Sequence, residues 1–267
     1  MDMSVSSVAD FEGRRFQTAA AHYLSGRPPY PDQLIARTVQ LIGLGKKDRL
    51  LDLGCGPGQL ALAFAPFLSE VVAMDPEPQM LAIARQAARE VRNMQVMEGR
   101  SDDLGEQLGR FKAVVIGRAF HWMDREETLR RLDRLIEPDG AVVLFGEEHP
   151  RLPENVRIRD YQQVLNAYSA DDKTHVILRT EGYTPHTSVL LGSAFNRLER
   201  IAIITRAPVT LKILTDRALS LSSTSRARLG PRADEMVDEL RRKMREWEAE
   251  SPMEEVLSAN ALIAWRG

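Results

Sequence analysis

The chain is poor in cysteine, with Cys55 alone among 267 residues. A single thiol excludes an intramolecular disulfide framework and a zinc site built from several thiolates, and it suits a reducing compartment. The histidines also lack metal-ligand spacing such as H-x-x-x-H or H-E-x-x-H. We therefore expect no metal site.

Long apolar runs and a strong net charge are missing too. No stretch reaches the roughly 18 apolar residues of a membrane span, and residues 1–16 are polar and carry acids, unlike a signal peptide. Thirty-six Lys and Arg residues against 38 Asp and Glu residues give a formal charge of -2. Because no overall field attracts nucleic acid or an anionic membrane, we expect a cytoplasmic protein with neither as a partner.

Short apolar runs alternate with helical patterns up to about residue 146, which is typical of βαβ units around a parallel sheet. Asp124 and Glu127 form a capping-box pair that begins a helix, and "EPDG" (137–140) is expected to turn the chain after it. The predicted strands are 49–54, 70–75, 94–99, 112–117 and 141–146, and two further helices are predicted at 59–68 and 78–90.

This rhythm ends after Gly146. Residues 147–195 are polar and rich in Arg, Tyr and His, and we interpret them as a largely helical insertion. A strand-like run at 198–210, a long charged helix at 232–250 and a last strand at 259–267 follow. The predicted fold class is α/β, a doubly wound Rossmann-like and mostly parallel seven-stranded sheet with an antiparallel last strand and a helical cap insertion.

"LLDLGCGPG" (50–58) places three glycines between the first strand and the helix after it. Such a loop lets backbone approach a ligand, and the helix N-terminus adds partial positive charge. The glycine spacing differs from the G-x-G-x-x-G of dinucleotide folds, and the Lys and Ser/Thr of a P-loop are absent. A nucleotide-binding turn is favoured, and a purely structural turn is the alternative.

The loop resembles the first motif of class I S-adenosylmethionine-dependent methyltransferases. The likeness extends to "VVAMDPEPQML" (71–81) and to "GRSD" (99–102), in which Ser101 replaces the usual alanine. "YLSGRPPYP" (23–31) and "AFHWMD" (119–124) resemble segments of the small-molecule branch, which includes UbiE-like and trans-aconitate methyltransferase-like members. Motif by motif, the resemblance covers about residues 20–146.

The resemblance implies S-adenosyl-L-methionine as cofactor and S-adenosyl-L-homocysteine as product. In that family an acid at the end of the second strand grips both ribose hydroxyls, and Asp75 stands there. The resemblance implies these cofactor-binding residues: Tyr23, Arg27, Tyr30, Asp52, Gly54, Cys55, Gly56, Gly58, Asp75, Pro76, Met80, Ser101, Asp102 and Arg118.

Methyl transfer needs an in-line approach of the acceptor, and a base is optional. His121 is the first catalytic candidate and His149 the second. Alternatively, His121 shapes the pocket while Trp122 packs, and His149 is solvated together with Glu147 and Glu148. The predicted acceptor-binding residues are Phe120, His121, Trp122, Tyr183 and His186. The arginines of the insertion raise the hypothesis of an anionic acceptor: Arg151, Arg157, Arg159 and Arg179.

The expected partner is a small-molecule acceptor, and the expected state is a monomer or a homodimer. A nucleic-acid methyltransferase is disfavoured, because "RAFHW" replaces the (N/D)-P-P-(Y/F) motif and no P-C dipeptide occurs. A nucleic-acid or protein methyltransferase on this fold, or a non-catalytic cofactor-binding protein, stays as the alternative. We divide the chain into an N-terminal helical lid segment (1–48), a cofactor-binding core (49–146), a cap over the acceptor site (147–195) and C-terminal strands and helix that complete the core (196–267).

Overall fold

The computed structural model describes residues 19–172, 183–250 and 252–267, and its seven strands in this part of the chain form one sheet. The strands are β1 (Arg49–Leu53), β2 (Glu70–Asp75), β3 (Met94–Glu98), β4 (Phe111–Gly117), β5 (Ile136–Glu148), β6 (Arg197–Pro208) and β7 (Glu254–Trp265). The α-helices are α1 (Ala20–Gly26), α2 (Asp32–Ile42), α3 (Gln59–Phe64), α4 (Pro78–Ala88), α5 (Arg125–Leu135), α6 (Val156–Tyr168), α8 (His186–Leu191), α9 (Leu211–Ser220), α10 (Arg226–Leu229) and α11 (Arg232–Glu250). Short 3₁₀ turns lie at η1 (Ala65–Phe67), η2 (Ser101–Asp103), η3 (Glu106–Leu108), η4 (Phe120–Trp122) and η5 (Pro153–Asn155).

The sheet has the strand order β3-β2-β1-β4-β5-β7-β6. The first five strands of this order are parallel, and β7 runs antiparallel to both β5 and β6. The predicted fold class, a mostly parallel seven-stranded sheet with an antiparallel last strand, is confirmed. Successive strands are added on one side of β1 up to β3 and on its other side from β4 onward, so the topological switch point lies between β1 and β4. Ligands of open α/β sheets bind at the carboxyl ends of the strands at such a point.

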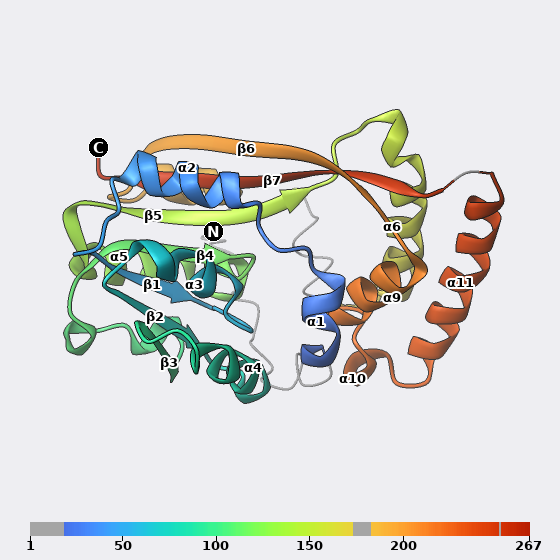
Figure 1. The fold of residues 1–267 in the computed structure, drawn as a ribbon, viewed down its shortest axis with the longest axis horizontal. Coiled ribbons are helices and arrows are strands. Elements are labelled where there is room, and N and C mark those ends of the chain that lie inside the picture. The colour runs from blue at the N-terminus through green and yellow to red at the C-terminus, as the bar shows by residue number, and fades with distance from the viewer. Residues whose placement is uncertain (1–18, 173–182, 251) are drawn as a thin grey trace, which may run out of the picture.

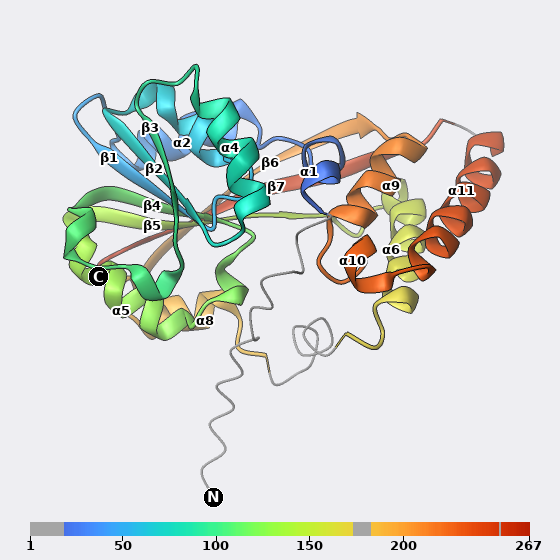
Figure 2. The ribbon, with the colours of Figure 1, turned by 90° about the horizontal axis from the view of Figure 1, so that it is seen from below.

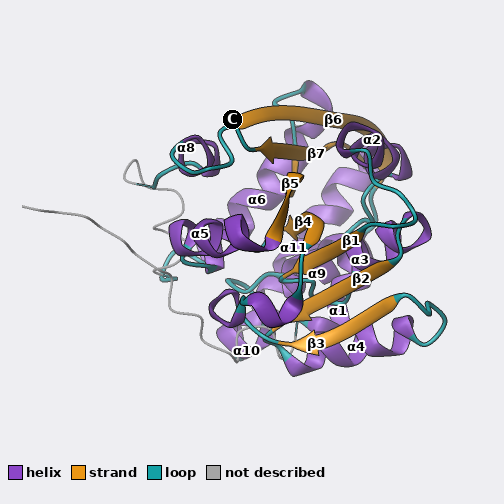
Figure 3. Cartoon of the chain, turned by 90° about the vertical axis from the view of Figure 1, so that its left-hand side faces the viewer, coloured by secondary structure: helices purple, strands orange, loops and turns teal. Residues whose placement is uncertain are grey.

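Helices cover both faces of the sheet, as Figure 3 shows. On one face α2, α3 and α4 bury apolar side chains such as Leu34, Phe64 and Leu81 against the strands. On the other face α5 and α8 do the same, with Leu132 and Leu190 fully buried. Burial on both faces explains why the central strands are near-continuous apolar runs.

The start of α5 agrees with the sequence pattern. Asp124 is the N-cap residue, and its Oδ1 accepts a hydrogen bond from the backbone N–H of Glu127 at 3.0 Å. Leu129, Leu132 and Leu135 then recur on the face that packs on the sheet. The predicted helix start is confirmed, because the cap satisfies a backbone donor that the first turn leaves free.

A separate apolar cluster lies beyond the sheet and is built from α6, α9, α10 and α11. Figures 1 and 2 show these helices together on one side of the molecule, with α1 between them and the sheet. We call this group the cap. Its helices come from both sides of residue 195, whereas α8 packs on the sheet. The division of the chain at residues 146 and 195 stays a prediction.

Three elements differ from the sequence-based expectation. The "EPDG" segment, expected as a turn, lies inside β5, where the pairing register with β4 shifts between Phe111 and Ala113. Helix α9 was not expected, although Thr210 caps it by accepting from the N–H of Ile213 at 3.3 Å. Strand β7 begins at Glu254, five residues earlier than the predicted Ala259, because its first half pairs with the far end of β6.

Among the described residues, no helix combines the length and the apolar character that crossing a membrane requires.

Candidate active site

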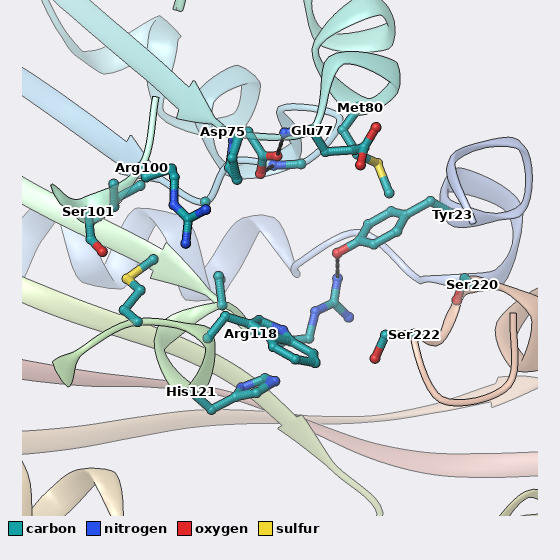
Figure 4. A pocket seen from close by; sticks show the side chains of 18 of the residues that line it. Tyr23, Asp75, Glu77, Met80, Arg100, Ser101, Arg118, His121, Ser220 and Ser222 are labelled. Carbon is teal, nitrogen blue, oxygen red and sulfur yellow. Dashed lines mark hydrogen bonds between the residues drawn. The ribbon is translucent and has the colours of Figure 1, made fainter. Parts of the chain in front are cut away.

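A cavity of about 310 Å³ opens where β1, β2 and β4 end. Its walls come from the glycine loop after β1, the segments after β2, β3 and β4, helix α1 and the loop after α9. It is lined by Tyr23, Arg27, Leu53, Gly54, Gly56, Asp75, Pro76, Glu77, Met80, Gly99, Arg100, Ser101, Gly117, Arg118, Ala119, His121, Trp122, Met123, Ser220, Leu221 and Ser222. Figure 4 shows the acids at one end and Arg118 with His121 at the other.

The loop glycines serve two different purposes. Gly54 has φ +72°, and a Cβ atom there would lie 2.6 Å from the Cβ of Ala119. Gly56 has φ +54°, and a Cβ atom there would meet nothing within 4 Å. Gly54 therefore lets the loop after β4 approach, and Gly56 leaves open space at the cavity wall. Gly58 begins α3 at φ +86° and does not line the cavity.

Asp52 lies on β1 and Cys55 lies within the glycine loop, and neither lines the cavity. Asp52 is 1% exposed, and its Oδ2 accepts from the N–H of Ala61 at 2.9 Å, in the first turn of α3. Burial raises the pKa of Asp52 to about 7, against the hydrogen bond from Ala61 and with help from the charge of Asp75. Burial, and then the charges of Asp52 and Asp75, also raise the pKa of the Cys55 thiol.

Asp75 ends β2 with its carboxylate at the cavity wall. Its Oδ2 accepts from the N–H of Gly56 at 2.8 Å and its Oδ1 from the N–H of Glu77 at 2.9 Å. Burial raises the pKa of Asp75 and the two backbone N–H groups lower it, with a net upward shift. Because each carboxylate oxygen can accept more than one hydrogen bond, Asp75 can still take a hydroxyl on each oxygen.

Glu77, which the sequence did not single out, lies beside Asp75. It caps α4 by accepting from the N–H of Gln79, while its buried Oε2 has no hydrogen-bond partner among the residues that the structure describes. Pro76 and Met80 line the same stretch of wall. The cavity therefore has one acidic end formed by Asp75 and Glu77.

Two arginines stand at the other end. Arg118 Nη1 lies 2.8 Å from Oε1 of Glu147 and forms an ion pair with it, although the angle is not that of a hydrogen bond. Arg27 Nη1 donates a hydrogen bond to the same Oε1 at 3.2 Å. Arg118 Nη2 also donates to the hydroxyl of Tyr23 at 3.2 Å, a contact drawn in Figure 4. Burial raises the pKa of Glu147, but the charges of Arg118, Arg27 and Arg217 outweigh it and lower the pKa.

The structure corrects the expectation that Glu147 is solvated. Its side chain is 16% exposed, and both of its arginine partners are distant in sequence. Glu148, the next residue, is exposed as expected.

His121 and Trp122 occupy the short turn after β4 and line the cavity, with ring centroids 4.8 Å apart. Burial, followed by the neighbouring His186 and Arg125, lowers the pKa of His121 to about 4. His121 is therefore an uncharged imidazole at neutral pH and a weak base.

The other predicted acceptor-binding residues lie behind His121. The His186 ring is 6.5 Å from that of His121 and 5.2 Å from that of buried Phe120. The Tyr183 hydroxyl is 3.4 Å from Nδ1 of His186, and Arg125 lies over the Tyr183 ring. The cavity walls include none of these three among the described residues, so they support the turn that carries His121.

His149 lies outside the cavity wall. Its Nε2 is 2.7 Å from Oε2 of Glu255, and Glu255 makes a bidentate ion pair with Arg217 at 2.6 and 2.7 Å. All three side chains are largely buried. The geometry shows a structural link between the end of β5, β7 and α9, and a catalytic role for His149 stays a prediction.

The remaining predicted residues include some that line the cavity and some that do not. Ser101 lines the cavity, whereas the Asp102 side chain is exposed and the Tyr30 ring packs edge-on against Phe145 at 5.3 Å. Arg151, Arg157 and Arg159 do not line the cavity. Arg179 lies outside the described residues, as does His175.

The sequence missed the wall that the cap supplies. Ser220 ends α9, and it lines the cavity together with the next two residues, Leu221 and Ser222. The Ser220 hydroxyl accepts from Nε of Arg27 at 3.0 Å. The serine-rich segment at 220–225 could have been noticed as a possible loop, but nothing in the local sequence ties it to a site.

Residues 50–140 match the family model described as a methyltransferase domain. The chain is 26% identical over 153 residues to the probable S-adenosylmethionine-dependent methyltransferase CRG1 of Saccharomyces cerevisiae, covering 56% of this chain and 50% of that protein. The chain spans about half the length of the curated relatives it matches.

Solved structures share the fold. A putative type II methyltransferase from Anaeromyxobacter dehalogenans superposes with a TM-score of 0.59 at 24% identity, covering 90% of this chain and 97% of that one. A methyltransferase from Geobacter sulfurreducens, solved in complex with S-adenosyl-L-homocysteine, gives 0.52 at 16% identity over 95% and 98% of the two chains. Over residues 50–140 this chain is therefore similar to the methyltransferase domain family, and its fold is shared with solved methyltransferases.

Proposed function

We propose that this protein transfers a methyl group from S-adenosyl-L-methionine to a small-molecule acceptor and releases S-adenosyl-L-homocysteine. The observation that carries the proposal is the position of Asp75. Its carboxylate faces a cavity beside a glycine loop whose middle glycine leaves open space. The matched methyltransferase domain contains both features.

The residues present fit the cofactor. The open space at Gly56 and the free lone pairs of Asp75 suit a ribose diol, and apolar Met80 lies next to them. Tyr23, Arg27 and Arg118 suit the amino-acid moiety at the opposite end. When bound, S-adenosylmethionine supplies an electrophilic methyl group on a sulfonium.

The acceptor side combines the β4 turn with the cap. His121 presents an unprotonated imidazole to the cavity at neutral pH, so it can accept a hydrogen bond from an acceptor O–H or N–H. Leu221 and Trp122 add apolar surface, and Ser220 and Ser222 add hydroxyls. Walls on both sides hold the acceptor in a fixed orientation, which is the main requirement of a displacement reaction.

A small acceptor is favoured because cap and core both line one cavity. The anionic acceptor expected from the insertion gains no support from Arg151, Arg157 or Arg159, which do not line it. The cytoplasmic location and the monomeric or homodimeric state stay predictions.

Calorimetric titration with S-adenosylmethionine, S-adenosylhomocysteine and NAD tests the proposal. We expect the two sulfur nucleotides to bind and Asp75→Ala to lose both. Glu98→Ala is the matched control, because Glu98 pairs in register with Asp75, ends β3 and is exposed. Binding of NAD instead, or of none of the three, would contradict the proposal.

A further inference from the structure

Glu147 does not line the cavity, but it contacts both arginines that form the basic end of the cavity. One of its oxygens, Oε1, is 2.8 Å from Nη1 of Arg118 and 3.2 Å from Nη1 of Arg27. Arg27 comes from the segment after α1, Arg118 from the end of β4 and Glu147 from the end of β5. One carboxylate oxygen thus brings together two arginines from separate parts of the chain.

The three side chains are largely withdrawn from water, with 14%, 15% and 16% of Arg27, Arg118 and Glu147 exposed. Two guanidinium groups this close repel each other, and the repulsion is strong where water is scarce. The carboxylate between them offsets it. The neighbouring Arg217 makes its bidentate pair with Glu255, whereas Arg27 and Arg118 make their direct ion pairs with Glu147.

Both arginines are also held by contacts other than those with Glu147. Arg118 has φ +57°, the left-handed region that a residue with a side chain occupies at a cost. Its guanidinium lies 5.3 Å from the ring centroid of Tyr30 and 5.7 Å from that of Tyr23. Arg27 is fixed through Nε by the Ser220 hydroxyl. These contacts hold both cations at the cavity wall in a preset arrangement.

Two arginine charges and one glutamate charge leave one positive charge at this end of the cavity. That balance suits one anionic group. We infer that Glu147 is a positioning residue, which holds Arg27 and Arg118 side by side as the binding site for the carboxylate of the cofactor's amino-acid moiety. The inference rests on the proposed function, and it assigns to Glu147 a role exerted through the arginines.

The test compares two ligands that differ at this end. S-adenosylhomocysteine carries the amino-acid moiety, whereas 5′-methylthioadenosine keeps the nucleoside and the sulfur and lacks it. We expect Glu147→Gln to weaken S-adenosylhomocysteine about tenfold or more in calorimetric titration. Affinity for methylthioadenosine should change by less than about twofold, because the adenosine end of the cavity is untouched.

Glu148→Gln is the matched control, since Glu148 is the next residue and is exposed. It should leave both affinities as they are. Equal weakening of both ligands by Glu147→Gln would show a general structural role, and an unchanged affinity for S-adenosylhomocysteine would show no role. Either result overturns the inference. If the wild-type protein binds neither ligand, the proposed function fails instead.

A double-mutant cycle with Arg27→Ala separates positioning from simple charge. If Glu147 acts through the arginine, Glu147→Gln costs about threefold or less once Arg27 is gone. If its charge acts directly on the ligand's ammonium group, the cost stays near tenfold and the inference is overturned. Glu147→Asp covers the case that Glu147→Gln does not fold, because it keeps the charge but is one methylene too short to reach both arginines. It should show the same selective loss, in smaller measure.

Discussion

Gly26 lies against the backbone of Arg217 so closely that a Cβ atom on Gly26 would fall 2.3 Å from the Arg217 nitrogen. The side chain of Arg217 reinforces the contact, since its Nε donates to the Gly26 carbonyl at 3.2 Å. Helix α1, which carries Tyr23 and leads to Arg27, is thereby fixed to α9, which leads to Ser220. This contact joins two cavity walls that are about 190 residues apart in the sequence.

Gly26→Ala should separate these two walls. Because the methyl group would meet backbone, α1 has to shift away from α9, and Tyr23 and Arg27 shift with it. We expect a loss of about 2 kcal/mol or more in unfolding free energy and a weaker affinity for S-adenosylhomocysteine. Gly192→Ala is the control, since its Cβ would meet the nearest atom at an ordinary 3.5 Å. Equal thermal stability of the two variants would contradict the argument.

The first two loop glycines should differ in what their replacement damages. Gly54→Ala adds a methyl group 2.6 Å from the Cβ of Ala119, so it should destabilise the fold and displace the turn that carries His121. Gly56→Ala meets no atom and pays only the backbone cost of a left-handed residue, about 1 kcal/mol. It should lower thermal stability less and weaken cofactor binding more. Thermal unfolding of both variants measures the loss of stability, and calorimetric titration with S-adenosylhomocysteine measures the loss of cofactor affinity.

Asp52 makes stability depend on pH in an unusual direction. Its pKa is raised to about 7 by burial, so the folded state holds the proton more tightly than the unfolded state does. Stability from this group is complete below the ordinary pKa of an aspartate and is lost as the pH rises towards 7. Asp52→Asn removes the dependence and keeps an acceptor for the Ala61 N–H.

Denaturant unfolding of wild type and Asp52→Asn at pH 5 and pH 8 measures the effect. The stability of the variant relative to wild type should rise by about 2 kcal/mol between these values. Other titrating groups cancel in the difference. A constant difference would show that Asp52 is ionised throughout this range.

His121 should not appear in the pH profile near neutrality. Its pKa is lowered to about 4, mainly by burial, so it stays unprotonated from pH 6 upward. Once an acceptor is known, the wild-type profile of kcat/KM should contain no ionisation near 6.5 that His121→Asn removes. His121→Asn should lower kcat by about tenfold and change S-adenosylhomocysteine affinity by less than about twofold. An ionisation near 6.5 that disappears in the variant would assign His121 as a general base with an ordinary pKa.

The sequence predicts the half of the site that is local. The glycine loop, Asp75 and the His121 turn each follow a strand directly, so the strand pattern and the topology of parallel sheets place them at one edge. Glu147 could not be read in this way, because its partners Arg27 and Arg118 lie 120 and 29 residues away in the sequence and no local pattern encodes either pair. The contact between His149 and Glu255 is equally hidden from the sequence, because Glu255 lies 106 residues away on the last strand, and a catalytic role for His149 stays a prediction.

Strand β7 follows every other described element in the sequence, yet it lies between β5 and β6 in the sheet. As the chain emerges from the ribosome, β5 has an open edge and β6 has no neighbour until residues 254–265 are made. The sheet therefore closes only after β7 has been made, when both of its antiparallel pairings form together. A nascent chain that stalls before this point exposes the open edge of β5 and the unpaired β6, which are templates for aggregation and substrates for chaperones.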